Sequence, residues 1–164
     1  MESIVDKQIR MGIDQSYNFA AVVVLQNSNV IDFEVIKSNK DDTIYNRALD
    51  VATRICDVYS KHKPEVVQME GLAFGTTGNV TRDLAGLLFT IINVMKILHP
   101  TVNVVLIPPT AVKKFATGSG KSKKPEMIAA LPPHVRELFE AKGYKKTTGL
   151  GDLSDAYWIG TIPA

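Results

Sequence analysis

Three apolar, strand-like segments follow one another near the start of the chain and are separated by very short connections. They span residues 8–15, 19–26 and 30–37, and the second contains an uninterrupted run of alanine, valine and leucine. The polar residues 26–29 between the second and the third segment are typical of a tight turn. Connections this short join antiparallel neighbours, because a parallel pair needs a long crossover. The pattern therefore predicts an antiparallel three-stranded meander.

Helical and strand-like patterns alternate in the rest of the chain. Asp41 or Asp42 can cap a first helix, which Lys63-Pro64 would end. The elements expected after it are a strand at 65–70, a helix from about 79 to 99, a strand at 102–107, and shorter helices at 108–115, 125–131, 133–141 and from about 152. A meander followed by alternating helices and strands predicts an α/β fold, with a five-stranded mixed sheet flanked by helices on both faces. No repeat or linker divides residues 1–164, so we expect one domain.

Composition excludes several protein classes. Apolar residues make up 45% of the chain and charged residues 22%, as in ordinary globular proteins and unlike disordered ones. Cys56 is the one cysteine, so no disulfide forms within the chain, and its place in a helical apolar pattern predicts a small core residue. The longest apolar window, residues 84–98, is interrupted by Asn93 and Lys96 and is too short to span a bilayer. The expectation is a cytoplasmic protein.

The net charge of +2 hides an uneven distribution along the chain. Residues 108–148 carry nine Lys or Arg and three Glu, a net charge of +6, so the remainder carries −4. A basic segment combined with acidic residues elsewhere is typical of a protein that binds both a polyanion and cations. A solvated lysine surface would give the same pattern, so charge alone does not decide between the two.

Asp14 and Glu70 each stand at the carboxyl end of an expected buried strand. Gly12, two residues before Asp14, would let another part of the molecule approach the backbone closely. Carboxylates at strand ends lie on the edge of an α/β sheet where ligands bind. Either residue taken alone could instead be an ordinary turn or cap.

Asp152 and Asp155 lie three residues apart at the expected start of the last helix. Side chains at this spacing share one helix face, so both carboxylates would point the same way. Simple helix capping remains an alternative, because acids favour helix N-termini. That alternative is serious for Asp152 and weaker for Asp155.

Together the four carboxylates predict a divalent-cation site, because clustered acids repel one another unless cations are bound. Oxygen ligands suit Mg²⁺ or Mn²⁺, whereas the three histidines are scattered and offer no zinc site. Two such cations about 4 Å apart can hydrolyse a phosphodiester: one lowers the pKa of the attacking water and the other stabilises the leaving 3′ oxygen. Lys113 or a lysine from residues 121–124 could add charge stabilisation. These features indicate a metal-dependent nuclease.

The motifs resemble those of the RuvC-type Holliday-junction resolvases over nearly the whole chain. The similarity rests on residues 11–16, 66–70 and 152–156, and on 107–121 with its proline-initiated helix, lysines and glycine-containing loop. It implies a ribonuclease-H-like fold and a homodimer that nicks two strands of a four-way DNA junction symmetrically with Mg²⁺, leaving 5′-phosphate and 3′-hydroxyl ends. The implied catalytic and metal-binding residues are Asp14, Glu70, Asp152 and Asp155.

The resemblance also implies contacts with DNA. Phe74 matches an aromatic residue that stacks on bases at the junction centre, although a loop-anchoring hydrophobe is an equal alternative. The other implied DNA-binding residues are Asn79, Arg82, Lys113, Lys114, Lys121, Lys123 and Lys124. Glycines at 75 and 78 could add phosphate binding through exposed backbone N–H groups before a helix N-terminus. Lysines on a flexible loop follow a backbone but do not read bases.

Departures from the family pattern occur beside the first carboxylate. Gln15 stands where many members have proline, and Phe19-Ala20 replaces a small polar residue and glycine. Such differences resemble divergent phage resolvases, which implies a broader range of branched DNA substrates. Three rivals remain: a sugar-kinase or actin-like ATPase, for which one chain of 164 residues is too short, a noncatalytic branched-DNA binder, and another ribonuclease-H-like nuclease.

Overall fold

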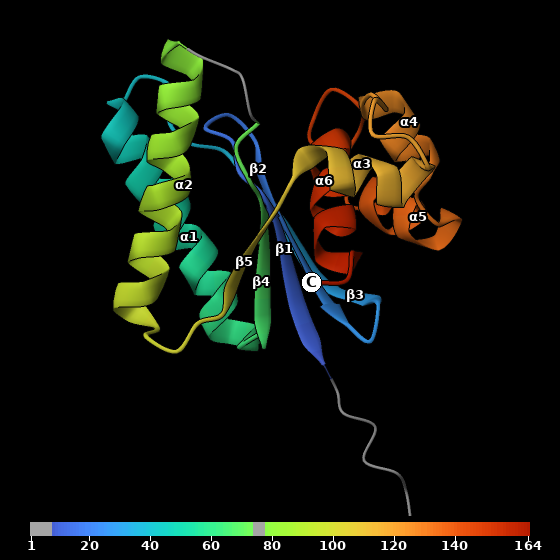
Figure 1. The fold of residues 1–164 in the computed structure, drawn as a ribbon, viewed down its shortest axis with the longest axis horizontal. Helices are drawn as coiled ribbons and strands as arrows, with labels where there is room; N and C mark the ends of the chain where they lie inside the picture. Colours follow the sequence, from blue (N-terminus) through green and yellow to red (C-terminus); the bar gives the residue numbers. More distant parts are fainter. Residues whose placement is uncertain (1–7, 74–77) are drawn as a thin grey trace, which may run out of the picture.

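The computed structural model describes residues 8–73 and 78–164, in which a five-stranded sheet lies between two layers of helices (Figure 1). The strands are β1 (Ile9–Asp14), β2 (Ala20–Gln26), β3 (Asn29–Ile36), β4 (Val66–Glu70) and β5 (Val104–Ile107). The helices are α1 (Ile44–His62), α2 (Asn79–Leu98), α3 (Pro109–Thr117), α4 (Lys124–Ala129), α5 (Pro133–Ala141) and α6 (Leu150–Thr161). Among the described residues, no helix is long and apolar enough to cross a membrane.

The strand order in the sheet is β3-β2-β1-β4-β5. Strands β1, β2 and β3 pair antiparallel, and Asn27 and Ser28 form the turn between β2 and β3 with positive φ angles of 49° and 68°. Strand β4 runs parallel to β1 on one side and to β5 on the other. The predicted meander and the mixed α/β sheet are therefore both confirmed. Because β1 and β4 are parallel neighbours, their carboxyl ends meet at one edge of the sheet.

Helices α1 and α2 pack together on one face of the sheet (Figure 1). Their buried side chains join those of the sheet in one core, to which Cys56 contributes as predicted. Leu87, Leu88 and Ile91 of α2 are buried, whereas Leu98 is 56% exposed. Leu98 is exposed because the helix ends there, beyond the part that packs on α1 and the sheet.

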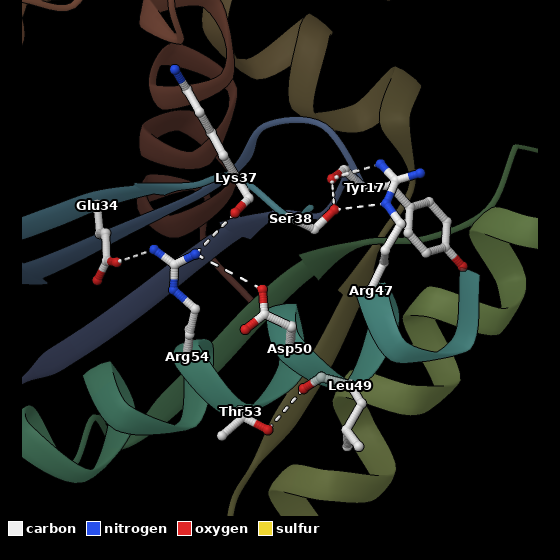
Figure 2. Close-up of polar contacts among 9 residues, drawn as sticks. All are labelled: Tyr17, Glu34, Lys37, Ser38, Arg47, Leu49, Asp50, Thr53 and Arg54. Carbon is white, nitrogen blue, oxygen red and sulfur yellow. Dashed lines mark hydrogen bonds and ion pairs between the residues drawn. The ribbon is translucent and has the colours of Figure 1, made fainter. Parts of the chain in front are cut away.

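Polar contacts fix α1 against the strands and loops beside it (Figure 2). The side chain of Arg54 reaches Glu34 on β3 and donates to the backbone oxygen of Lys37. The guanidinium of Arg47 donates to Ser38 Oγ at 2.9 Å and to the backbone oxygen of Tyr17 at 3.3 Å. The contact between Arg47 and Tyr17 holds the loop between β1 and β2, which directly follows Asp14.

The first turn of α1 differs from expectation at its cap. Thr43 is the N-cap residue, and its hydroxyl accepts a hydrogen bond from the backbone N–H of Asn46. Asp42 instead accepts bonds from the backbone N–H of Thr43 and from the Asn46 amide. The capping role predicted for Asp41 or Asp42 therefore belongs to Thr43.

Helix α6 covers the opposite face of the sheet, with α3, α4 and α5 packed around it (Figure 1). Glycine permits its close approach to β1: a Cβ atom on Gly12 would lie 2.1 Å from the backbone oxygen of Ala156 and 2.5 Å from the backbone nitrogen of Gly160. Backbone contact of this kind needs two surfaces without side chains. It places the first turns of α6 over the carboxyl end of β1.

Candidate active site

One open pocket of about 760 Å³ contains all four predicted carboxylates. Asp14 ends β1, Glu70 ends β4, and Asp152 and Asp155 project from the first half of α6. The parallel pairing of β1 with β4 brings the first two together, and the close packing of α6 on β1 adds the other two. Residues distant in sequence therefore meet at the edge where the parallel strands end.

Burial raises the pKa of three of these carboxyl groups. Burial raises the pKa of Asp14 well above its ordinary value, and the negative charges of Asp155, Glu70 and Asp152 add to the effect. Burial raises the pKa of Asp155 to about 7. Burial also raises the pKa of Glu70, although the positive charges of Lys113 and Lys124 oppose the rise. The site therefore favours the binding of cations, which would stabilise the ionised carboxylates.

Helix α6 begins at Leu150, two residues earlier than the sequence indicated. Gly149 occupies the N-cap position, and no side chain among the described residues caps the helix with a hydrogen bond. Asp152 lies inside the first turn, where its carboxylate accepts a hydrogen bond of 2.5 Å from the ammonium of Lys124. Asp152 is therefore not the cap of α6, because Gly149 holds that position.

The predicted basic residues fall into two groups. Lys113, Lys121, Lys123 and Lys124 line the same pocket as the carboxylates. Lys114 is exposed on α3 and does not line it, while Asn79 and Arg82 lie exposed in the first turn of α2. Arg82 pairs there with its neighbour Asp83 at 3.3 Å. Phe74 and Gly75 lie outside the described residues, so their predicted contacts with DNA stay predictions.

Gln15 is a site residue whose role the sequence did not reveal. Its Nε2 atom donates a hydrogen bond of 2.6 Å to the backbone oxygen of Glu70. Backbone pairing between β1 and β4 stops at Ile13 and Met69, so this side chain links the two strands just beyond the last pair. Proline, which many members of the similar family have at this position, has no such donor. The departure from the family pattern was the available signal, and only the structure gave it a physical meaning.

The donor set of the pocket fits a hard divalent cation in its chemistry. Four carboxylates supply oxygen ligands, which suit Mg²⁺ or Mn²⁺, and neither His nor Cys is among the described residues that line the pocket. In the described ranges 8–73 and 78–164, however, no three His, Cys, Asp or Glu side chains are already disposed around one point. A cation held by three or more of these carboxylates would therefore require their side chains to move closer together.

Comparison with solved structures shows where this fold recurs. RuvC from Thermus thermophilus is 19% identical over 93% of this chain and 91% of its own, with a TM-score of 0.68. The same protein in complex with a Holliday junction substrate gives a TM-score of 0.70 at 19% identity, over 93% of this chain and 90% of the other. Fowlpox virus resolvase, in complex with substrate Holliday junction DNA, gives 0.54 at 15% identity, over 93% of this chain and 94% of the other. These similarities confirm the ribonuclease-H-like fold.

Sequence comparison supplies the family. Among curated proteins, no sequence matches significantly. The family model for the crossover junction endodeoxyribonuclease RuvC matches residues 11–156, a span that begins in β1 and ends one residue after Asp155. This match and the shared fold show that the chain belongs to the RuvC family of Holliday junction resolvases.

Proposed function

We propose that this protein is a metal-dependent endonuclease that resolves four-way DNA junctions, and that it also cuts other branched DNA. The observation that carries the proposal is the gathering of Asp14, Glu70, Asp152 and Asp155 in one open pocket that four lysines also line. Relatives of the same fold were solved in complex with Holliday junction DNA. A protein that only bound branched DNA would gain nothing from four acids in its polyanion site, because they would repel phosphate.

In the proposed reaction, water attacks phosphorus, the bond from phosphorus to the 3′ oxygen breaks, and that oxygen takes up a proton. The products are a 5′-phosphate and a 3′-hydroxyl. Asp14, Glu70, Asp152 and Asp155 would hold Mg²⁺ or Mn²⁺, which when bound lowers the pKa of water and neutralises charge on the phosphate. Gln15 keeps the strand end that carries Glu70 beside the one that carries Asp14.

The lysines that line the pocket give the phosphate a place to bind. The positive charge of Lys113 acts on both Glu70 and Asp155, so its ammonium lies close enough to offset negative charge that builds on a bound phosphate. Lys121 and Lys123 belong to the loop before α4 and are exposed. We assign Lys113 to the reacting phosphate and the two exposed lysines to the neighbouring DNA backbone.

Incubation with synthetic DNA substrates tests the function directly. The protein is mixed with a four-way junction, a flap and a linear duplex of equal length, each with Mg²⁺ or with a chelator. We expect nicks in opposite strands of the junction with Mg²⁺, slower cutting of the flap, and an intact duplex. Junction binding without cleavage in Mg²⁺ and in Mn²⁺ would instead identify a noncatalytic binder. Labelled ends show whether the products carry 5′-phosphate.

Removal of two exposed lysines should weaken binding and flatten its salt dependence. In the double variant Lys121→Ala, Lys123→Ala, two contacts between ammonium groups and phosphates are lost, so the slope of log K against log salt should fall in magnitude by about two. Fluorescence anisotropy with a labelled junction at several salt concentrations measures this slope. Lys63→Ala, at the C-terminal end of α1, is the matched control and should leave the slope unchanged. An unaltered slope in the double variant would remove these lysines from the DNA interface.

The predicted homodimer has a candidate surface on the outward face of α2. Phe89 is 56% exposed and Ile97 is 76% exposed, and their spacing of eight residues places both on one side of the helix. Symmetric cleavage of a two-fold junction needs two active sites, which a second copy would supply. We therefore expect Phe89→Glu to shift the protein from dimer to monomer in sedimentation at micromolar concentration. A wild-type protein that is already monomeric under these conditions would contradict this assignment.

A further inference from the structure

The ammonium group of Lys124 lies among the carboxylates of the pocket. Its Nζ atom is 2.5 Å from Oδ1 of Asp152 and 3.9 Å from Oδ2 of Asp155. The hydrogen bond that Lys124 donates to Asp152, and the charges on Asp14, Asp152 and Asp155, raise the pKa of Lys124, although its partial burial opposes the rise. The ammonium of this lysine is therefore paired with the acids, although 52% of its side chain is exposed.

Neighbouring residues hold Lys124 in this position. It is the first residue of α4, which is anchored by the buried side chains of Met127 and Ile128. Its aliphatic stem lies across Gly151 on α6, where a Cβ atom would be 3.0 Å from Cδ and 3.1 Å from Cε of the lysine. A glycine directly before Asp152 thus leaves the space through which the lysine reaches the two carboxylates.

From these contacts, and on the basis of the proposed function, we infer that Lys124 is a built-in cation that competes with the divalent metal for Asp152 and Asp155. The ammonium and the metal need the same carboxylate oxygens, so both cannot hold them at once. Among the described residues, no three acidic side chains are grouped closely enough to hold a metal ion. This separation is expected while the ammonium of Lys124 lies between Asp152 and Asp155. The metal would enter as Lys124 leaves.

A DNA phosphate gives the displaced ammonium a new partner. Transfer of Lys124 from the carboxylates to a phosphate frees oxygen ligands for the metal, so bound DNA raises the affinity for metal, and bound metal raises the affinity for DNA by the same factor. The lysine thereby disfavours metal loading in the absence of substrate. This control of loading is distinct from any stabilisation of charge during cleavage.

Measurement of Mn²⁺ affinity without DNA tests the inference. Lys124→Met keeps the aliphatic stem and removes the charge. Lys63→Met, at the C-terminal end of α1 and outside the pocket, is the control. Binding is followed by electron paramagnetic resonance of free Mn²⁺. We expect Lys124→Met to bind Mn²⁺ about tenfold more tightly than wild type, and Lys63→Met to stay within about twofold. Equal or weaker binding by Lys124→Met overturns the inference.

Two further measurements keep the test decisive. Thermal unfolding in a chelator should show Lys124→Met less stable than wild type, because the acids lose their counter-charge, and added Mn²⁺ should raise its melting temperature more than that of wild type. Gly151→Ala keeps the lysine charge but crowds its stem, so it should also tighten Mn²⁺ binding, by a smaller factor. Junction cleavage by the wild-type protein separates the two proposals. If wild type cleaves the junction but Lys124→Met and Gly151→Ala bind Mn²⁺ as wild type does, only the role of Lys124 is refuted. If wild type cleaves in no metal, the proposed function is refuted.

Discussion

Asp14→Asn is expected to abolish junction cleavage, by roughly 10³-fold or more, while the protein still binds the junction. Asp14 is the carboxylate on which the other three act electrostatically, and its substitution removes a charged oxygen ligand from the centre of the site. The measurement is a single-turnover cleavage rate in Mg²⁺ together with a binding isotherm in a chelator. Asp57→Asn, on the exposed surface of α1, is the control and should match wild type in both.

Stability should change in the opposite direction from activity. The folded-state pKa of Asp14 is raised above its unfolded value, so the folded protein holds a proton that the unfolded chain releases, and the free energy of unfolding falls as pH rises from about 4 upward. Asparagine has no such proton. In a chelator, Asp14→Asn should therefore melt above wild type at pH 8 and converge with it near pH 3. A variant that loses both cleavage and stability would show that Asp14 has a structural role instead.

Gly12→Ala is expected to destabilise the fold by about 3 kcal/mol, a large effect for one methyl group. The added Cβ would collide with backbone atoms of Ala156 and Gly160, and backbone cannot rotate away as a flexible side chain can. Helix α6 would have to move off β1, and Asp155 would move with it. Urea unfolding followed by circular dichroism should show a lower midpoint with an unchanged slope.

Gly86→Ala is the matched control for that substitution. Gly86 lies within α2, where an added Cβ atom meets only the hydroxyl of Tyr17 at 3.9 Å, an ordinary contact. Alanine also favours the helix over glycine by roughly 0.5–1 kcal/mol, so this variant should be slightly stabilised. If both variants shift the midpoint equally, the contact between α6 and β1 is not what Gly12 permits.

Local patterns in the sequence were enough to predict the order of elements and the four acids. The strands of the meander are short apolar segments joined by turn residues such as Asn27 and Ser28. Strands that follow one another across such short turns pair with each other, so the sequence order predicts the pairing. Asp14 and Glu70 could be singled out because each ends an apolar strand. Asp152 and Asp155 could be added because their spacing places both on one helix face. The resemblance to a known family pointed to the same four residues, and the family model confirmed that resemblance.

Only the tertiary structure decided which charged side chains meet. Lys124 and Asp152 are 28 residues apart, and nothing in the local pattern distinguishes Lys124, which pairs with the acids, from Lys114, which does not line the pocket. Likewise, Gln15 acquires a partner because β4 lies parallel to β1. Asp152 lies in the first turn of α6 and is not its cap, because the helix begins two residues earlier than its sequence suggested. Periodicity and turn residues report local conformation, whereas long-range electrostatic partners depend on how the elements pack in space. The sequence alone determined the order of the helices and strands and which four acids to single out. The packing of those elements decided which lysines and amides lie beside the acids.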